Sequence, residues 1–324
     1  MKVLVTGAAG FIGSKLMYCL SRRGDEVVGL DSINDYYDVR LKEGRLREFG
    51  ASSRFVRMNI ADKAALDALF ERERFDKVVN LAAQAGVRYS ITHPYTYLES
   101  NLTGFLNILE ACRNFGVKHL VYASSSSVYG LNTKVPYAEA DKTDSPVSLY
   151  AATKKSNELL AHSYCKLYGI AMTGLRFFTV YGPWGRPDMA PMLFAKAICK
   201  GEPIKVFNHG DMIRDFTYID DIVEGTTRAL DRVPSPDANG LPFRVYNIGC
   251  SHPVKLMDFI SEMEQALGIE AKKEFLPMQA GDVYQTNADT SLLEREVGYK
   301  PVVQLHEGLG QFAQWYLSEK NPLR

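Results

Sequence analysis

Short apolar runs alternate with longer segments of helical periodicity over the first half of this chain. Each apolar run is short and continuous, as expected for a strand that is buried on both faces. These predicted strands cover residues 2–7, 26–31, 77–83, 118–125 and 171–178. The predicted helices between them cover residues 11–24, 62–74, 96–116 and 148–169. Regular alternation of strand and helix predicts an α/β fold with a doubly wound parallel sheet.

The pattern changes after Val180. The following residues include Gly182, Pro183, Gly185, Pro187 and Pro191. Gly and Pro at this density leave little room for regular structure, and helical and short strand patterns resume only afterwards. We therefore predict two domains. The larger covers residues 1–178 plus about 215–248, and a smaller, mixed α/β C-terminal lobe covers about 179–214 plus 249–324.

The charge balance gives no sign of a nucleic-acid or membrane partner. Lys plus Arg and Asp plus Glu both number 38, so no long-range field favours a polyanion. No apolar run reaches membrane-spanning length, and the first residues predict a strand and a turn rather than a secretory leader. The five cysteines are scattered without metal-ligand spacing. We expect a cytoplasmic protein with no metal, nucleic-acid or membrane partner.

The segment TGAAGFIG, residues 6–13, follows the first predicted strand and opens the first predicted helix. Gly7, Gly10 and Gly13 give it the spacing GxxGxxG, which lets a pyrophosphate approach the backbone closely. Glycines at this spacing also fit an ordinary strand-to-helix turn. Asp31 favours the dinucleotide, because it ends the next strand, where a carboxylate bonds ribose hydroxyls. A carboxylate there repels a 2′-phosphate, which favours NAD over NADP.

Tyr150 and Lys154 stand four residues apart in YAATK, on a predicted helix, and so share one face. An ammonium beside a phenol favours the ionised phenol, which makes a base for a sugar hydroxyl. A structural role is the alternative for Tyr150, since an aromatic side chain at the start of a helix commonly packs on the sheet.

Several motifs in order resemble those of the extended short-chain dehydrogenases/reductases, which have a Rossmann-like fold. They are GxxGxxG, SSSSVYG at 124–130, YxxxK and RFFTVYGP, with RDFTYIDDI and PMQAGDVYQTNAD further along. Within that superfamily, NDYYDVRLK at 34–42 and RFFTVYGPWGRPDMA at 176–190 resemble the UDP-glucuronate 4-epimerases. The similarity extends over nearly the whole chain.

The resemblance implies roles for individual residues. Tyr150 is the base, Lys154 lowers its pKa and holds the nicotinamide ribose, and Ser125 bonds the reacting oxygen. The neighbouring serines 124, 126 and 127 are alternatives to Ser125. Asn59 stands where the family usually has Asp beside adenine. The expected NAD-binding residues are Gly7, Gly10, Phe11, Ile12, Gly13, Asp31, Asn34, Asn59, Ile60, Leu81, Ala82, Ala83, Gln84, Asn101, Tyr150, Lys154 and Phe177.

The residues before VYG bear on which reaction follows oxidation of the sugar. Relatives that decarboxylate carry Glu directly before this Val, and relatives that dehydrate carry Asp-Glu at the two preceding positions. This chain has Ser126 and Ser127 there, which donate hydrogen bonds but are not useful acids. The sequence therefore favours epimerisation. The expected substrate contacts are Arg88, Ser125, Ser126, Ser127, Thr179, Arg186, Phe207, Arg214 and Asp282.

Within that set, Arg88 and Thr179 are expected at a sugar carboxylate, Arg186 and Arg214 at the diphosphate, Phe207 at uracil and Asp282 at the nucleotide ribose. The resemblance thus implies conversion of UDP-glucuronate to UDP-galacturonate through a 4-keto sugar, with NAD kept bound. Three alternatives stay open: a UDP-glucuronate decarboxylase, a neutral UDP-hexose 4-epimerase and an NAD-sensing binding protein. The resemblance also implies a homodimer, formed through helices at 95–115 and 148–169 of each subunit.

Overall fold

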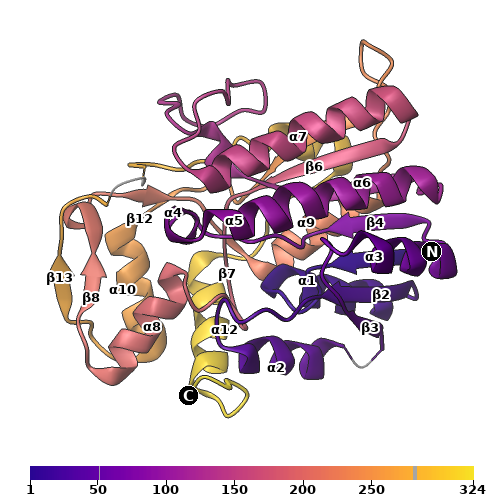
Figure 1. Cartoon of the computed structure of the whole chain (residues 1–324). Coiled ribbons are helices and arrows are strands. Elements are labelled where there is room, and N and C mark those ends of the chain that lie inside the picture. Colours follow the sequence, from indigo (N-terminus) through magenta and orange to yellow (C-terminus); the bar gives the residue numbers. More distant parts are fainter. Residues whose placement is uncertain (51, 280–282) are drawn as a thin grey trace.

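A seven-stranded parallel sheet forms the centre of the computed structural model, which describes residues 1–50, 52–279 and 283–324 (Figure 1). Its strand order is β11-β6-β5-β4-β1-β2-β3. The strands are β1 Lys2–Thr6, β2 Glu26–Asp31, β3 Arg54–Arg57, β4 Lys77–Asn80, β5 His119–Ser125, β6 Ala171–Phe177 and β11 Phe243–Ile248. Every neighbouring pair is parallel. The predicted Rossmann-like, doubly wound fold is confirmed.

Helices cover both faces of this sheet because successive strand residues point to opposite sides. Val3 and Val5 join one apolar core, while Leu4 joins the other. The first core includes residues of α1 (Phe11–Arg22), α2 (Val39–Phe49) and α9 (Ile219–Asp231). The second includes residues of α3 (Lys63–Glu73), α6 (Gly104–Asn114) and α7 (Leu149–Tyr168). Figure 1 shows α6 and α7 side by side over the sheet.

The strands β3 and β11, which the apolar pattern did not predict, are the two edges of the sheet. Their sequences, RFVR and FRVYNI, carry charged and amide side chains, and β3 is only partly buried. An edge strand has one neighbour and is less enclosed, so it tolerates polar residues that a central strand does not. Continuous apolar runs therefore predict the five central strands but not the two edge strands.

The predicted helix at 96–116 is interrupted. It consists of α5 (Pro94–Tyr97), a π-helical turn η1 (Leu98–Thr103) and α6. The turn buries Asn101, which is 1% exposed. Single π turns within helices are often found at functional sites. Apolar spacing gave no indication of this one, because it depends on the partners of one amide side chain.

Outside the seven-stranded sheet, the described residues form three small two-stranded sheets. These pair β7 (Thr179–Tyr181) with β10 (Phe216–Tyr218), β8 (Ile204–Val206) with β13 (Lys273–Phe275), and β9 (Ile213–Arg214) with β12 (Val254–Lys255). The helices in the predicted C-terminal lobe are α8 (Ala190–Lys200), α10 (Leu256–Leu267) and α12 (Leu305–Leu317), and α8 and α10 lie to the left of the large sheet in Figure 1. The short elements α4 (Tyr89–Thr92), η2 (Ser126–Tyr129), η3 (Phe207–Gly210) and α11 (Ser291–Val297) complete the described structure. The domain boundaries given above stay a prediction.

The strand order reverses between β1 and β4, since the chain proceeds from β1 to β2 and β3 on one side and from β4 to β5 and β6 on the other. Ligands of doubly wound sheets bind outside the carboxyl ends of the strands at such a switch point. The glycine-rich turn, the segment after β4 and the serine run after β5 all start from that edge.

Candidate active site

A cavity opens at the switch point and extends from the glycine-rich turn to the loop after β7. Most of the predicted site residues line it. They are Gly7, Gly10, Phe11, Ile12, Gly13, Asp31, Asn34, Asn59, Ile60, Leu81, Ala82, Ala83, Gln84, Ser125, Ser126, Ser127, Tyr150, Lys154, Phe177, Thr179 and Arg186. Residues far apart in sequence therefore meet in one place.

The glycine-rich turn is too crowded for side chains. Gly7 has φ +70°, and a Cβ there would lie 2.8 Å from the backbone nitrogen of Ala82. A Cβ on Gly13 would lie 2.1 Å from the carbonyl oxygen of Gly7, so α1 begins in contact with the turn. The backbone therefore borders the cavity directly at the start of a helix, where a pyrophosphate binds well. These residues fit a bound dinucleotide.

Asp31 ends β2 at the cavity wall. Its carboxylate accepts hydrogen bonds from the backbone N–H of Ala9 at 3.1 Å and of Ile33 at 2.8 Å. These bonds hold it beside the glycine-rich turn, with lone pairs left for ribose hydroxyls. Asn59, at the same end, donates to Glu99 and accepts from the Ala61 N–H.

The π turn supports the loop that follows β4. Asn101 Oδ1 accepts from the Gln84 N–H at 2.8 Å, and its Nδ2 donates to the Gln84 carbonyl at 3.0 Å. The same Nδ2 donates to Thr153 on α7. Asn101 thus lies behind the cavity lining and ties the Gln84 loop to the helix that carries Tyr150. Its predicted contact with the cofactor stays a prediction.

Tyr150 and Lys154 project from the first turns of α7, which Ser148 caps by accepting from the Ala151 N–H. Lys154 is 4% exposed, and its Nζ donates to the Ala123 carbonyl of β5 at 2.8 Å. Burial raises the pKa of Tyr150, whereas a hydrogen bond with Ser125 and the charge of Arg186 act in the opposite direction. Arg186 is thus a cation that acts to lower the pKa of Tyr150, and the predicted effect of Lys154 on that pKa stays a prediction.

Burial lowers the pKa of Lys154 from 10.5 to about 8, which predicts a measurable pH effect. Between these pH values the unfolded chain binds the proton and the folded chain does not, so this lysine makes stability rise with pH. As pH rises from about 8 to 10.5, the free energy of unfolding of wild type should increase relative to that of Lys154→Met by up to roughly 3 kcal/mol. Denaturant titrations at several pH values measure this difference. A flat difference would contradict the burial, and the partly exposed neighbour Lys155, changed to Met, provides the control.

The four consecutive serines at the end of β5 and the start of η2 have different environments. The Ser124 hydroxyl donates to Glu158 at 2.7 Å, and Arg176 binds the same carboxylate, so Ser124 is held by a buried ion pair. The Ser125 hydroxyl donates to Ser127 Oγ at 3.1 Å and accepts from the Ser127 N–H. Ser125 is also the serine of this run that acts to lower the pKa of Tyr150, and its predicted contact with the reacting oxygen stays a prediction.

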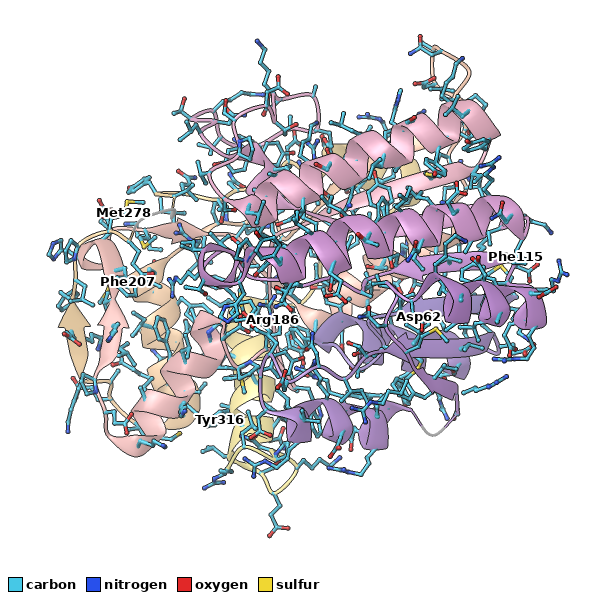
Figure 2. All side chains as sticks on the ribbon, in the orientation of Figure 1. Asp62, Phe115, Arg186, Phe207, Met278 and Tyr316 are labelled. Atoms are coloured by element: carbon cyan, nitrogen blue, oxygen red, sulfur yellow. The ribbon has the colours of Figure 1, made fainter. Side chains whose placement is uncertain are left out.

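Arg186 lies at the centre of the molecule, between the sheet and the second lobe (Figure 2). Its guanidinium binds Asp188 with two hydrogen bonds, of 3.1 and 2.6 Å, and Tyr36 donates to the same carboxylate at 2.9 Å. Burial acts to lower the pKa of Arg186, but Asp188 outweighs it and leaves that pKa raised. A fixed cation therefore lies at the Tyr150 end of the cavity.

Four predicted substrate contacts are not among the cavity-lining residues. The Arg88 guanidinium lies 5.7 Å from the centre of the Phe207 ring, so these two residues contact each other. Arg214 donates to the backbone carbonyls of Val283 and Tyr284. Asp282 lies outside the described residues. The roles assigned to these four stay predictions.

The sequence pattern missed several residues that line the cavity. Lys42 Nζ donates to the carbonyl and side-chain oxygens of Asn34 at 2.7 and 2.6 Å, beside Asp31. Tyr36 and Gly86 lie near Arg186, and a Cβ on Gly86 would meet the Tyr36 hydroxyl at 2.8 Å. The signal for Lys42 and Tyr36 was present, since both belong to the NDYYDVRLK motif.

Comparison with known proteins agrees with this geometry. Residues 3–249 match the NAD dependent epimerase/dehydratase family. The chain belongs to this family. A glycine-rich turn and an acidic residue at the end of the next strand are features of dinucleotide-binding sites, and in this chain both line the same cavity as Tyr150 and Lys154.

Relatives within the epimerase/dehydratase family are similar over nearly the whole chain. A UDP-glucuronate 4-epimerase from Arabidopsis thaliana is 51% identical, over 98% of this chain and 75% of its own. A probable UDP-glucuronate 4-epimerase from Rhizobium meliloti is 48% identical, over 98% and 97%. The crystal structure of UDP-glucuronic acid 4-epimerase from Bacillus cereus, with UDP-glucuronic acid and NAD, is 36% identical, with a TM-score of 0.86 and 97% and 98% coverage.

The described residues include no helix that is both long and apolar enough to cross a membrane. Within the same residues, no three His, Cys, Asp or Glu side chains gather in a way that could hold a metal ion. The cysteines described are all free thiols.

Proposed function

We propose that this chain is an NAD-dependent UDP-sugar 4-epimerase that converts UDP-glucuronate to UDP-galacturonate. One observation carries the choice of reaction. Among the described residues that line the cavity, the only carboxylate is Asp31, at the adenosine end. The Tyr150 end is lined by the hydroxyls of Ser125, Ser126, Ser127 and Thr179 together with Arg186. None of the described residues that line that end is a carboxylic acid, and Asp188 beside Arg186 is bound by that guanidinium and by Tyr36.

The residues divide the work as follows. Tyr150 as phenolate removes the proton of the sugar 4-hydroxyl, and Ser125 donates a hydrogen bond to the same oxygen. Bound NAD accepts the C4 hydride and returns it. Between these events the 4-keto sugar turns its other face, and Tyr150 finally gives the proton back. The glycine-rich turn, Asp31 and Lys154 hold the cofactor.

A 4-keto uronate is a β-keto acid, so the site must restrain its carboxylate. The breaking bond must overlap the ketone π system before CO₂ can leave. Hydrogen bonds from Ser126, Ser127 and Thr179 would hold the carboxylate near the plane of the sugar, where that overlap is poor. The three hydroxyls therefore support epimerisation without loss of CO₂.

Incubation with UDP-glucuronate, followed by NMR of the anomeric protons, tests the proposal. A UDP-galacturonate signal is the expected result. UDP-xylose with release of CO₂ would identify a decarboxylase instead. Turnover of UDP-glucose without turnover of UDP-glucuronate would move the activity to neutral hexoses, and bound NAD with no turnover of any sugar would indicate a sensor.

We further propose that the protein is a cytoplasmic homodimer that supplies UDP-galacturonate for polysaccharide biosynthesis. The dimer proposal depends on apolar side chains that are exposed on α5, η1, α6 and α7. They are Tyr95, Leu98, Leu106, Leu159 and Leu167, with exposed fractions from 39% to 79%. The helices that carry these residues are neighbours in the structure (Figure 1), and exposed apolar side chains on adjacent helices are typical of a protein–protein interface.

Changing Leu159, which is 61% exposed on α7, to Glu is expected to produce a monomer. A charge buried in an apolar interface is unpaired and costs more than the contact provides. Light scattering after size-exclusion chromatography measures the mass. Leu193→Glu, at a 44% exposed position on α8, is the control and should leave the dimer intact. A Leu159→Glu protein with the mass of wild type would place the interface elsewhere.

A further inference from the structure

Arg45 is a fully buried cation that links the two ligand-binding segments of the site. It is 0% exposed, on α2. Its Nη1 donates to the Ala9 carbonyl in the glycine-rich turn at 3.1 Å and to the Tyr37 hydroxyl at 2.6 Å. Its Nε and Nη2 donate to the Trp184 carbonyl at 2.9 and 2.7 Å, and Nη2 also reaches Gly185.

The Trp184 backbone that Arg45 holds is strained. Trp184 has φ +66°, a left-handed conformation that bulky side chains rarely adopt and that costs free energy. Its indole packs on α2 at Gly44, where a Cβ would lie 2.6 Å from the ring. Two adjacent residues of α2 therefore fix one residue, since Gly44 receives the indole and Arg45 binds the carbonyl. Trp184 stands two positions before Arg186.

A second contact from the same region acts on the same loop. Tyr36 donates to Asp188, which holds the Arg186 guanidinium. Tyr37, the next residue, accepts from Arg45. The segment NDYYDVRLKEGR, residues 34–45, thus holds the loop of Arg186 on both sides of that arginine. Residues of two motifs that lie far apart in sequence are thus in direct contact.

We propose that Arg45 is a positioning residue that holds Arg186 at the Tyr150 end of the cavity and ties that loop to the cofactor turn. The proposal rests on the proposed function for its substrate, UDP-glucuronate. Arg45 touches neither substrate nor reacting atoms. It acts through two backbone segments, Ala9 on the cofactor side and Trp184–Gly185 on the substrate side.

The guanidinium is suited to this task in geometry and in charge. Its planar fork donates in several fixed directions at once, which a single ammonium cannot do. Its hydrogen-bond partners among the described residues are three carbonyls and a phenol hydroxyl, all neutral, so none of the described carboxylates pairs with it at hydrogen-bond distance. A buried charge in that state is costly unless something offsets it. It binds the Ala9 carbonyl under the turn where the pyrophosphate of the dinucleotide would bind, and there its positive charge would favour that anion.

The test measures kcat and KM for UDP-glucuronate, bound NAD per chain and melting temperature. Arg45→Met should lower kcat by roughly 10- to 100-fold and should also lower bound NAD. Arg45→Lys keeps the charge but not the fork, so it should retain more NAD than Arg45→Met without recovering kcat. Arg40→Met is the control, because Arg40 lies on the same helix, is exposed and pairs with Asp38.

A second variant makes the test independent of the stability of a buried charge. Gly44→Ala pushes the Trp184 ring and leaves the guanidinium intact, so it should lower kcat with little change in bound NAD. Arg45→Met with unchanged kcat per NAD-loaded chain would overturn the proposal, even if its melting temperature fell. So would full recovery of kcat in Arg45→Lys. If wild type fails to turn over UDP-glucuronate, the proposed function fails, while bound NAD in the Arg45 variants still tests the link to the cofactor turn.

Discussion

Tyr150→Phe is expected to lower turnover of UDP-glucuronate by roughly 10²- to 10⁴-fold, the usual contribution of a general base. Phenylalanine keeps the ring and its packing 6.1 Å from the Tyr97 ring, so the fold should be preserved. The variant loses the one phenol oxygen that bonds Ser125 and lies in the field of Arg186. Bound NAD should therefore be unchanged while epimerisation fails. Anomeric proton NMR and the NAD content of the purified protein measure both results.

Tyr168→Phe is the matched control for this experiment. Tyr168 ends the same helix, and its ring is 4.2 Å from the guanidinium of Arg113, a contact that phenylalanine also makes. Its activity should equal that of wild type. Turnover retained by Tyr150→Phe at the level of this control would remove Tyr150 from the mechanism and leave another group as the base.

Gly13→Ala has the second largest expected effect. The new methyl would lie 2.1 Å from the Gly7 carbonyl oxygen, and because this atom belongs to the backbone, α1 and the turn must separate. Overpacking costs about 1–3 kcal/mol, which lowers NAD affinity by about 10- to 100-fold if the strain falls on the binding site. Bound NAD per purified chain, measured after acid release, should fall, and activity should fall with it. Added NAD should restore part of that activity.

Gly310→Ala tests whether the loss comes from the turn or from the substitution type. Gly310 lies on α12, is exposed, and a Cβ there meets nothing within 4 Å. Alanine in a helix is favoured over glycine, so this variant should be slightly more stable and fully loaded with NAD. Normal NAD content in Gly13→Ala would mean that the turn can absorb a methyl group and that the expected overlap with the Gly7 carbonyl oxygen is relieved without loss of binding.

Much of the site could be predicted because its residues occupy short motifs with fixed local geometry. The GxxGxxG spacing of Gly7, Gly10 and Gly13 predicts a tight turn before a helix. The four-residue spacing of Tyr150 and Lys154 predicts that they share one face of a helix. The prediction that UDP-glucuronate 4-epimerases are relatives of this chain is confirmed by the family match and by identity near 50%. Individual residue roles within the site are still to be tested by the variants proposed above.

The features that the sequence did not predict have a common cause. The edge strands β3 and β11, the π turn at Asn101 and the contacts of Arg88 and Phe207 depend on which neighbour lies beside each residue. Lys42, Tyr36 and Arg45 belong to or adjoin a quoted motif, yet spacing did not indicate that they lie near the cofactor turn or the loop of Arg186. Charged residues on a helix are usually solvated, and only the fold shows that Arg45 is not.

By itself, the sequence determined the α/β class, the dinucleotide turn, the Tyr–Lys pair and the family, because each depends on residues close together in the chain. Only the tertiary structure decided that Arg186 lies at the Tyr150 end of the cavity and that Asp188 and Tyr36 hold it there. Those questions concern distances between β5, α7, α2 and the loop after β7, which are brought together by the packing of a sheet and its helices. The same packing buries Arg45 and Lys154, and burial determines how strongly their charges act.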